Sequence, residues 1–467
     1  MQPVTIGFIV YLVFIFCVGL YTVRFMKNIK DFALGGNRLG PVVIAFSERA
    51  SGESAWLLIG LPGAALTAGL LELWTVLGCI TGASLSWFVI AKRLRVATGE
   101  HGAITLPELF AKRFKDKKGY IQLLASLIIT FFFTFYVSAQ FHGAGKVLNV
   151  TFGLDHFHGM LLGAGIIIFY TLLGGFFAVA WTDVIQGIIM IGTLVILPIV
   201  GFIELSGHEY SGAVWDASTL FGGEVGFGAL IGAVAGLSWG LGYIGQPHLV
   251  TRFMAIDKAE NIKVGRRIAV AWVFPAFFGS MFIGLVGAKL IAAGVIPAYA
   301  DPEKLMPEMA NLLLPSWVAG IFISGAIAAM MSTADSQLLV STTVLTEDII
   351  GRFFRKQIGK LKLLTIGRIL TIFIGIIAFY LAWHSTELVF ETVSYAWGGL
   401  GASFGPALLL TLWWKRTSKA GVISGMIAGT LFTIVDISGG AITPRLTAFV
   451  LAFVAVTLFS VLFPDKK

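Results

Sequence analysis

Long, continuous runs of apolar residues constrain the fold of this chain more than any other feature. Many of them reach the roughly 20 residues that an α-helix needs to cross the hydrocarbon layer of a bilayer. Lipid offers no partner to a backbone N–H or C=O group, so such runs must be helical, and the alternating pattern of a transmembrane barrel is absent. Hydrophobic residues make up 57% of the 467 residues, and charged residues only 12%. We therefore predict an all-α integral membrane protein, which excludes a soluble enzyme, a disordered protein and a nucleic-acid-binding protein.

The apolar runs predict about thirteen transmembrane helices. The first lacks a signal-peptide cleavage pattern and is long enough to cross, so we interpret it as retained. The predicted spans are residues 3–24, 41–70, 71–91, 120–149, 158–180, 182–205, 226–250, 266–298, 316–346, 364–384, 390–413, 418–438 and 444–463.

The distribution of basic residues predicts the orientation. Most of the 33 Lys and Arg residues, Arg252 among them, fall in every second connection between the predicted spans. Cytoplasmic connections carry an excess of Lys and Arg, which predicts an N-terminus outside and a C-terminus in the cytoplasm. We expect a multi-pass protein of the inner (plasma) membrane, surrounded by lipid. The net charge of +8 follows from this topology, so it implies no nucleic-acid partner, and no feature implies a protein partner.

Polar residues interrupt span 2 at membrane depth, where a central carboxylate costs about 2.5–3.5 kcal/mol on insertion scales. The segment 47–56 reads Ser-Glu-Arg-Ala-Ser-Gly-Glu-Ser-Ala-Trp and places three charges between apolar residues. We predict that the helix breaks near Ser51–Ser54, so that free carbonyl and hydroxyl groups face a polar cavity. The alternative is an unbroken helix in which Glu48 and Arg49 pair with neighbours.

Span 7 carries three glycines followed by Pro247 in the segment 238–248, which makes a poor straight helix. Trp239 and Tyr243 are four residues apart and share one face, where their rings would suit the wall of a small-solute pocket. Ordinary packing of an aromatic pair is the alternative.

The two interrupted spans are five spans apart. Interrupted helices in corresponding positions indicate a transporter built from inverted repeats, and an odd number of spans turns the second copy upside down. We predict a five-plus-five core, with the first repeat in residues 41–205 and the second in residues 206–413. Residues 1–40 and 414–467 would be peripheral.

Span 9 places hydroxyl groups beside small residues. Ser332 and Thr333 offer two adjacent hydroxyls, and a small hard cation such as sodium prefers oxygen ligands. Hydrogen bonding between helices explains the same residues equally well. Asp335 follows in an otherwise apolar span, where it would cap a polar network or lie near the inner vestibule.

Spans 5 and 6 are joined by a short connection that we place near residues 180–182. Asp183 and Thr182 would cap the next helix, where an acidic group is favourable. A role for Asp183 in releasing an ion toward the cytoplasm is the alternative.

Four of these segments resemble the sodium/solute symporter family, in order along the chain. They are Ala50-Ser51-x-x-Ser54-x-Trp56, the run from Tyr170 to Gln186, Trp239-Gly240-Leu241-Gly242-Tyr243 and Ala329-x-Met331-Ser332-Thr333. The resemblance extends from about residue 3 to residue 460 and is closest to the bacterial sodium/proline symporters. It implies the thirteen-span form of the five-plus-five inverted-repeat fold.

The resemblance also implies site residues. Sodium would be held by carbonyl groups of Ala50, Glu53 and Ala329 and by the hydroxyls of Ser332 and Thr333. The solute would meet Ser54, Ala55, Tyr136, Trp239 and Tyr243. Asp183 matches an acidic position that relatives place near the inner ion path, and Asp335 is a second candidate for that path.

One position departs from the pattern of the proline symporters. They have an Asp where this chain has Gly52, and an apolar residue where it has Glu53. A carboxylate beside the ion site would raise sodium affinity, take up a proton or shift the solute preference.

We therefore expect a secondary active transporter, not an enzyme, that couples sodium entry to uptake of a small zwitterion, with L-proline as the expected solute. Sodium is the coupling ion in this interpretation. One alternative is a sodium symporter for another solute, such as another amino acid, a sugar or a carboxylate. The others are a transporter-like solute sensor and an ion channel.

Overall fold

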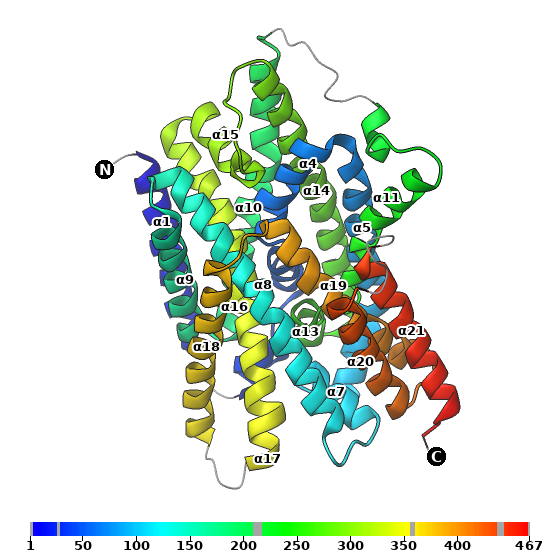
Figure 1. The fold of residues 1–467 in the computed structure, drawn as a ribbon. Coiled ribbons are helices and arrows are strands. Elements are labelled where there is room, and N and C mark those ends of the chain that lie inside the picture. The colour runs from blue at the N-terminus through cyan, green and yellow to red at the C-terminus, as the bar shows by residue number, and fades with distance from the viewer. Residues whose placement is uncertain (1–2, 26–28, 209–216, 355–359, 437–442, 466–467) are drawn as a thin grey trace.

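The computed structural model describes residues 3–25, 29–208, 217–354, 360–436 and 443–465, and the regular elements in these ranges are helices (Figure 1). The helices of the first half are α1 (Pro3–Val23), α2 (Ile29–Leu34), α3 (Pro41–Gly52), α4 (Leu61–Ala68), α5 (Glu72–Leu85), α6 (Ala91–His101), α7 (Leu106–Arg113), α8 (Tyr120–Phe152), α9 (His156–Leu173) and α10 (Phe176–Leu205). Those of the second half are α11 (Phe227–Leu237), α12 (Trp239–Gly242), α13 (Pro247–Ala255), α14 (Ile262–Ala292), α15 (Leu305–Leu313), α16 (Ser316–Thr343), α17 (Arg352–Phe354), α18 (Lys360–Trp383), α19 (Val389–Trp413), α20 (Lys419–Ile434) and α21 (Pro444–Leu462).

Each predicted span coincides with helical structure in the described ranges. By length and apolar composition, eight helices there can cross a membrane, or nine if the bent pair α11–α13 counts as one span. Helices α9 and α20 are apolar but shorter. The predicted all-helical membrane fold is confirmed.

The boundary between spans 5 and 6 lies earlier than predicted. Helix α9 ends at Leu173 and α10 begins at Phe176, whereas we expected the connection near residues 180–182. Gly174 and Gly175 adopt extended backbone and form the connection. The prediction was wrong because the apolar run continues across these two glycines, which are poor helix formers. Asp183 consequently lies well inside α10.

The predicted break in span 2 is confirmed. Helix α3 ends at Gly52, and Glu53 leaves helical geometry with φ −106° and ψ 81°. The chain resumes as a π-helical turn, Trp56–Gly60, that leads into α4. Pro62 has no N–H to donate to the preceding turn, which favours an irregular turn here.

The predicted break in span 7 is confirmed too. A turn separates α12 from α13, and the axis bends by 42° between the two parts of the span. Gln246 is extended, with φ −69° and ψ 112°, because the residue before a proline avoids the helical region. Pro247 then occupies the first turn of α13, where its missing N–H costs nothing.

Glycines bring α12 against its neighbours backbone to backbone. A Cβ atom added at Gly82 of α5 would overlap the backbone of Gly240, and one added at Gly401 of α19 would overlap that of Gly242. Helix α12 therefore touches α5 and α19 backbone to backbone at these glycines, and the Trp397 ring of α19 also packs against it.

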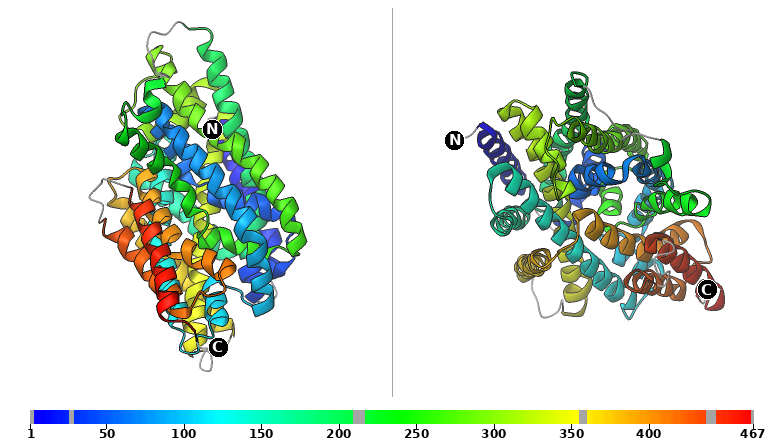
Figure 2. Two further views of the ribbon diagram at one scale, coloured as in Figure 1. Left: turned by 90° about the vertical axis from the view of Figure 1, so that its right-hand side faces the viewer. Right: turned by 45° about the horizontal axis from the view of Figure 1, so that its top comes forward.

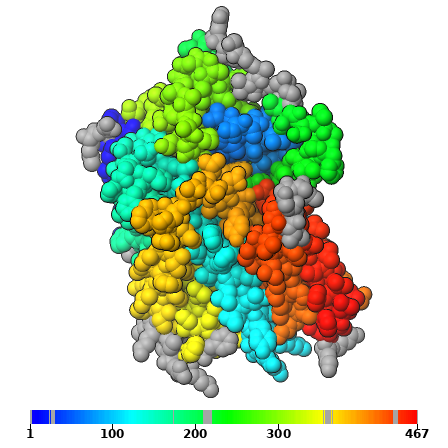
Figure 3. All heavy atoms as spheres, in the orientation of Figure 1, coloured from blue at the N-terminus to red at the C-terminus, as the bar shows by residue number. Residues whose placement is uncertain are grey.

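The helices run along the long axis of the bundle, with the start of α1 toward one end and the end of the chain at the other (Figures 1 and 2). We call these the upper and lower ends, as drawn in Figure 1. Helix α1 lies on one flank and α21 on the opposite flank (Figure 2). The blue α4–α5 region reaches the surface at the upper end, close to the orange start of α19 (Figure 3).

Candidate ion and solute site

The break at the end of α3 meets α16 through a set of closely spaced oxygen atoms. The Ser332 hydroxyl donates to the Ala50 carbonyl at 2.8 Å and to the Ala329 carbonyl at 3.1 Å. The Thr333 hydroxyl donates to the Ser51 carbonyl at 3.0 Å. The structure therefore brings together four of the five predicted sodium-binding residues, and it adds the carbonyl of Ser51. The Glu53 carbonyl takes no part in these contacts.

This set fits a small hard cation. All five residues are fully buried, and their oxygens are carbonyls and hydroxyls, the neutral donors that such a cation accepts. The α3 carbonyls near the break are available because the helix stops there and no next turn donates to them.

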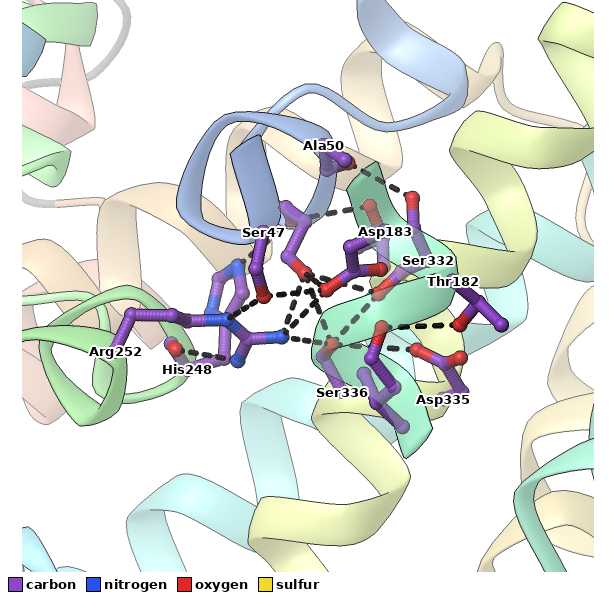
Figure 4. Close-up of polar contacts among 12 residues, drawn as sticks. Ser47, Ala50, Thr182, Asp183, His248, Arg252, Ser332, Asp335 and Ser336 are labelled. Carbon is purple, nitrogen blue, oxygen red and sulfur yellow. Dashed lines mark hydrogen bonds and ion pairs between the residues drawn. The ribbon is translucent and has the colours of Figure 1, made fainter. Parts of the chain in front are cut away.

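A second polar cluster includes Asp183, Arg252 and Ser336 and shares Ser51 with the first set (Figure 4). The Asp183 carboxylate of α10 accepts hydrogen bonds from the hydroxyls of Ser47 at 2.6 Å and Ser51 at 3.1 Å. Arg252 of α13 donates to Asp183 at 3.3 Å and to Ser51 at 2.7 Å, and it also contacts Ser336 of α16. One guanidinium thus joins α3, α10, α13 and α16.

Two predictions for this cluster were wrong. Arg252 was placed in a cytoplasmic connection, but it is fully buried because its charge is compensated by Asp183. Thr182 and Asp183 were expected to cap a helix, but α10 begins at Phe176 and its cap is Gly175. The Thr182 hydroxyl instead accepts from Tyr170 at 2.6 Å.

Asp335 belongs to the same polar cluster, as expected. Its carboxylate accepts from the Ser336 hydroxyl at 3.2 Å, and it is fully buried. One carboxylate oxygen of Asp335 and one of Asp183 have no hydrogen-bond partner in the described part of the chain. With Arg252, the cluster formally carries two negative charges and one positive charge.

Stacked aromatic rings fill the space between the two breaks. Trp239 stacks on Trp56 with ring centroids 4.9 Å apart and an angle of 20° between the planes, and Phe390 of α19 lies 4.9 Å from Trp239. Tyr243 packs edge-on against Trp397 at 4.6 Å. Trp239 and Tyr243 are both buried, so the rings close the predicted pocket in this conformation.

The remaining predicted solute residues lie beside these rings. The Ser54 and Tyr136 hydroxyls are 3.4 Å apart, and the Ala55 N–H donates to the side-chain oxygen of Gln140 at 3.0 Å. Tyr136 also faces Trp397, with ring centroids 6.3 Å apart. Helix α8 therefore lines the break of α3 with polar groups.

Glu53 is held by charged and polar partners. Its carboxylate accepts from Arg49 at 3.0 Å and from the Tyr243 hydroxyl at 3.0 Å. Arg49 also pairs with Glu48, which accepts from the Trp87 ring nitrogen at 2.8 Å. The predicted break is therefore present, and the unbroken helix of the alternative is not. The pairing of Glu48 and Arg49 that the alternative assumed is nevertheless found. The triad of Glu48, Arg49 and Glu53 formally carries one net negative charge.

Sequence reasoning missed several residues of this site. Ser47 and Ser51 are four residues apart, as are His248 and Arg252, and this spacing was the available signal. His248 donates to the Ser51 carbonyl at 3.2 Å, and Arg252 donates to the His248 carbonyl at 2.7 Å. Trp56 lies in a segment that resembles the symporter family but was given no role, and Phe390 gave no signal, because aromatic residues in an apolar span are ordinarily packing.

Comparison with known proteins gives relatives that cover nearly the whole chain. A family model described as the sodium:solute symporter family matches residues 32–429. The high-affinity proline transporter PutP of Bacillus subtilis is 39% identical over 436 residues, which cover 91% of this chain and 90% of that protein. The sodium/proline symporter of Escherichia coli is 36% identical over 469 residues, 98% of this chain and 93% of that protein.

Solved structures confirm the fold class. A sodium-coupled sialic acid symporter in a substrate-bound, outward-open state gives a TM-score of 0.83 at 20% identity, over 100% of this chain and 99% of the other. The transporter MhsT, in complex with L-phenylalanine, gives 0.58 at 15% identity, over 91% and 98% of the chains. The architecture is that of an inverted-repeat membrane transporter with broken helices.

Proposed function

We infer the activity from one premise: the chain belongs to the sodium:solute symporter family, and it is therefore a multi-pass membrane transporter and not an enzyme. We propose that it couples the inward flow of sodium to the uptake of a small zwitterionic solute, L-proline above all, by alternating access. The two relatives named for proline transport support this solute. The proposed repeats are residues 41–205 and 206–413, with residues 1–40 and 414–467 peripheral.

The single observation that carries the proposal is the meeting of the α3 break with α16. Sodium would bind the Ala50 and Ala329 carbonyls and the hydroxyls of Ser332 and Thr333, with the Glu53 carbonyl as a further ligand. The Ser332 hydroxyl now donates to the Ala50 and Ala329 carbonyls, and the Thr333 hydroxyl donates to the Ser51 carbonyl. An ion between them would turn the lone pairs of all these oxygens toward itself and so bind α3 to α16 more firmly.

The solute would bind between the two breaks. Trp239 and Tyr243 supply the apolar wall, and Ser54, Ala55 and Tyr136 supply the polar side. The solute carboxylate would face the positive N-terminal end of a half-helix. Because Trp239 stacks on Trp56, the two rings must separate before a solute can enter, which gives the site a closed and an open form.

The cluster around Asp183, Asp335 and Arg252 would form the ion path toward the lower end. It connects to the proposed sodium site through Ser51, whose carbonyl and hydroxyl face the two clusters. In this proposal the upper end faces the outside and the lower end, which carries the C-terminus, faces the cytoplasm, as the distribution of basic residues predicts.

The membrane potential would supply the driving force. Each positive charge that moves inward gains about 2.3 kcal/mol per 100 mV. That energy alone sustains a ratio of inside to outside solute concentration of nearly two powers of ten, since about 1.4 kcal/mol corresponds to a factor of ten.

Uptake into proteoliposomes tests the proposal. Labelled L-proline should accumulate under an inward sodium gradient and not under an equal potassium gradient, and uptake should saturate. A panel of other amino acids, sugars and carboxylates as competitors identifies the preferred solute. Proline uptake that does not respond to sodium would refute the coupling, and sodium-driven uptake of another solute in preference to proline would refute the solute.

A further inference from the structure

Arg445, at the start of α21, is half-buried, and its guanidinium lies against the end of α11 and against α19. Its carbon Cζ lies 4.6 Å from the centre of the Trp239 ring, the proposed wall of the solute site. It donates to the Ser238 hydroxyl at 3.3 Å and to the Ala235 carbonyl at 3.2 Å, and it also contacts the Ser394 hydroxyl. Helix α21 thus reaches the site although it lies on the flank of the bundle.

The guanidinium lacks a counter-charge at close range. No carboxylate oxygen in the described ranges lies within 4.0 Å of it, and Glu72 and Glu391 act on it only from farther away. In this respect it differs from Arg49 and Arg252, which are buried and each pair with a carboxylate. Arg445 is half-buried, and an anionic partner would be favourable beside a guanidinium that has no opposite charge next to it.

The hydrogen bonds leave donor groups for such a partner. A guanidinium has five N–H groups, and three of them donate to the neutral oxygens of Ala235, Ser238 and Ser394. Arg445 lies beside Gly242 and Gly398 between α12, α19 and α21, which pack here too closely to admit a water molecule, so a carboxylate would reach the guanidinium from its exposed side.

We propose that Arg445 receives the carboxylate of the transported solute at an access subsite beside Trp239, before the rings of Trp56 and Trp239 separate. This inference rests on the proposed function, since it takes the solute to be a zwitterion. A guanidinium binds a planar carboxylate in preference to a neutral amide, because it can donate two parallel hydrogen bonds to the anion. Arg445 would therefore determine the preference for solutes with a free carboxylate.

L-proline and L-prolinamide provide the test, because they share ring and amine and differ only in the carboxylate. Binding to the purified full-length protein and sodium-driven uptake are measured for both compounds in wild type and in Arg445→Gln. We expect the KM for proline to rise about tenfold or more in the variant, as expected for loss of a charge-assisted hydrogen bond. We expect the discrimination between proline and prolinamide to shrink by a similar factor, and Arg445→Lys, which keeps the charge, to retain part of it.

Arg93 provides a matched control. Its guanidinium lies 3.5 Å from the centre of the Trp413 ring, in an exposed position away from the site. Arg93→Gln removes the same kind of cation–ring contact and should leave KM and discrimination unchanged. If Arg445→Gln does not fold, Arg445→Met keeps the apolar stem and replaces it in the comparison.

The outcomes separate the inference from the function on which it rests. Sodium-driven proline uptake in wild type, with unchanged KM and discrimination in the neutral variants, would overturn the inference alone. An equal rise in KM for both compounds would also overturn it, since it would indicate a merely structural role. Carboxylate-selective binding that is lost in the variants, without sodium-driven uptake in wild type, would support the subsite and refute the proposed coupling.

Discussion

Removal of the two hydroxyls of α16 tests the proposed sodium site directly. The Ser332 and Thr333 hydroxyl oxygens lie 2.8 Å and 3.0 Å from carbonyl oxygens of the α3 break, so an ion placed among them would contact both. A hydrogen bond or contact to a charged group contributes about 1.5–3 kcal/mol. Ser332→Ala or Thr333→Val should therefore raise the sodium concentration for half-maximal uptake about tenfold to a hundredfold.

The assay compares sodium activation of proline uptake in proteoliposomes with thermal stability at low and high sodium. Ser324→Ala is the matched control, because Ser324 is a fully buried serine of the same helix whose hydroxyl donates within that helix, to the Gly320 carbonyl. It should leave sodium activation unchanged.

The alternative role of these hydroxyls, bonding between helices, predicts a different result. The Ser332 and Thr333 variants would then lose stability equally at all sodium concentrations and keep the wild-type sodium dependence. That outcome would refute the assignment of the ion site.

Three further substitutions test the charges and the packing around the site. Arg252→Met should lower the free energy of unfolding by about 3–5 kcal/mol, because it leaves the buried carboxylate of Asp183 uncompensated, and Asp183→Asn in the same chain should recover part of the loss in a denaturation assay. Glu53→Gln should weaken sodium activation of uptake, because it removes the net negative charge of a buried triad; unchanged activation would mean that this carboxylate is structural. Gly82→Ala should abolish uptake or folding, since the added methyl group overlaps the backbone of α12, whereas Gly165→Ala, which faces open space, should behave as wild type in expression and uptake.

The fold was largely predictable from the sequence because lipid imposes simple rules. Long apolar runs must be helical, so helical structure lies at each of the thirteen predicted spans, although only eight or nine helices in the described ranges are long and apolar enough to cross a membrane; clusters of glycine, serine and charge marked both breaks. The ends of spans were less predictable. Gly174 and Gly175 end α9, yet nothing in the surrounding apolar run distinguishes them from the glycines that lie inside other helices.

The site was predictable only where a motif or a local rule pointed to it. Trp239, Tyr243, Ser332 and Thr333 lie within recognisable segments, and the structure brings them to the two breaks. Arg252 was assigned to a connection, because the rule for basic residues counts charges and does not consider partners. Its partner on α10 lies 69 positions away in the sequence, and only the packed structure brings the two together.

The bare contacts of α12 with α5 and α19 determine how the broken span can move. Where Gly240 and Gly242 touch the backbone of α5 and α19, the segments cannot slide past one another in small steps, because no side chain lies at those points to absorb the shift. We therefore expect any rearrangement that opens the proposed solute site to carry these three elements together. The turn at residues 243–246 and the non-helical backbone at Glu53 would then be the hinges that absorb the motion.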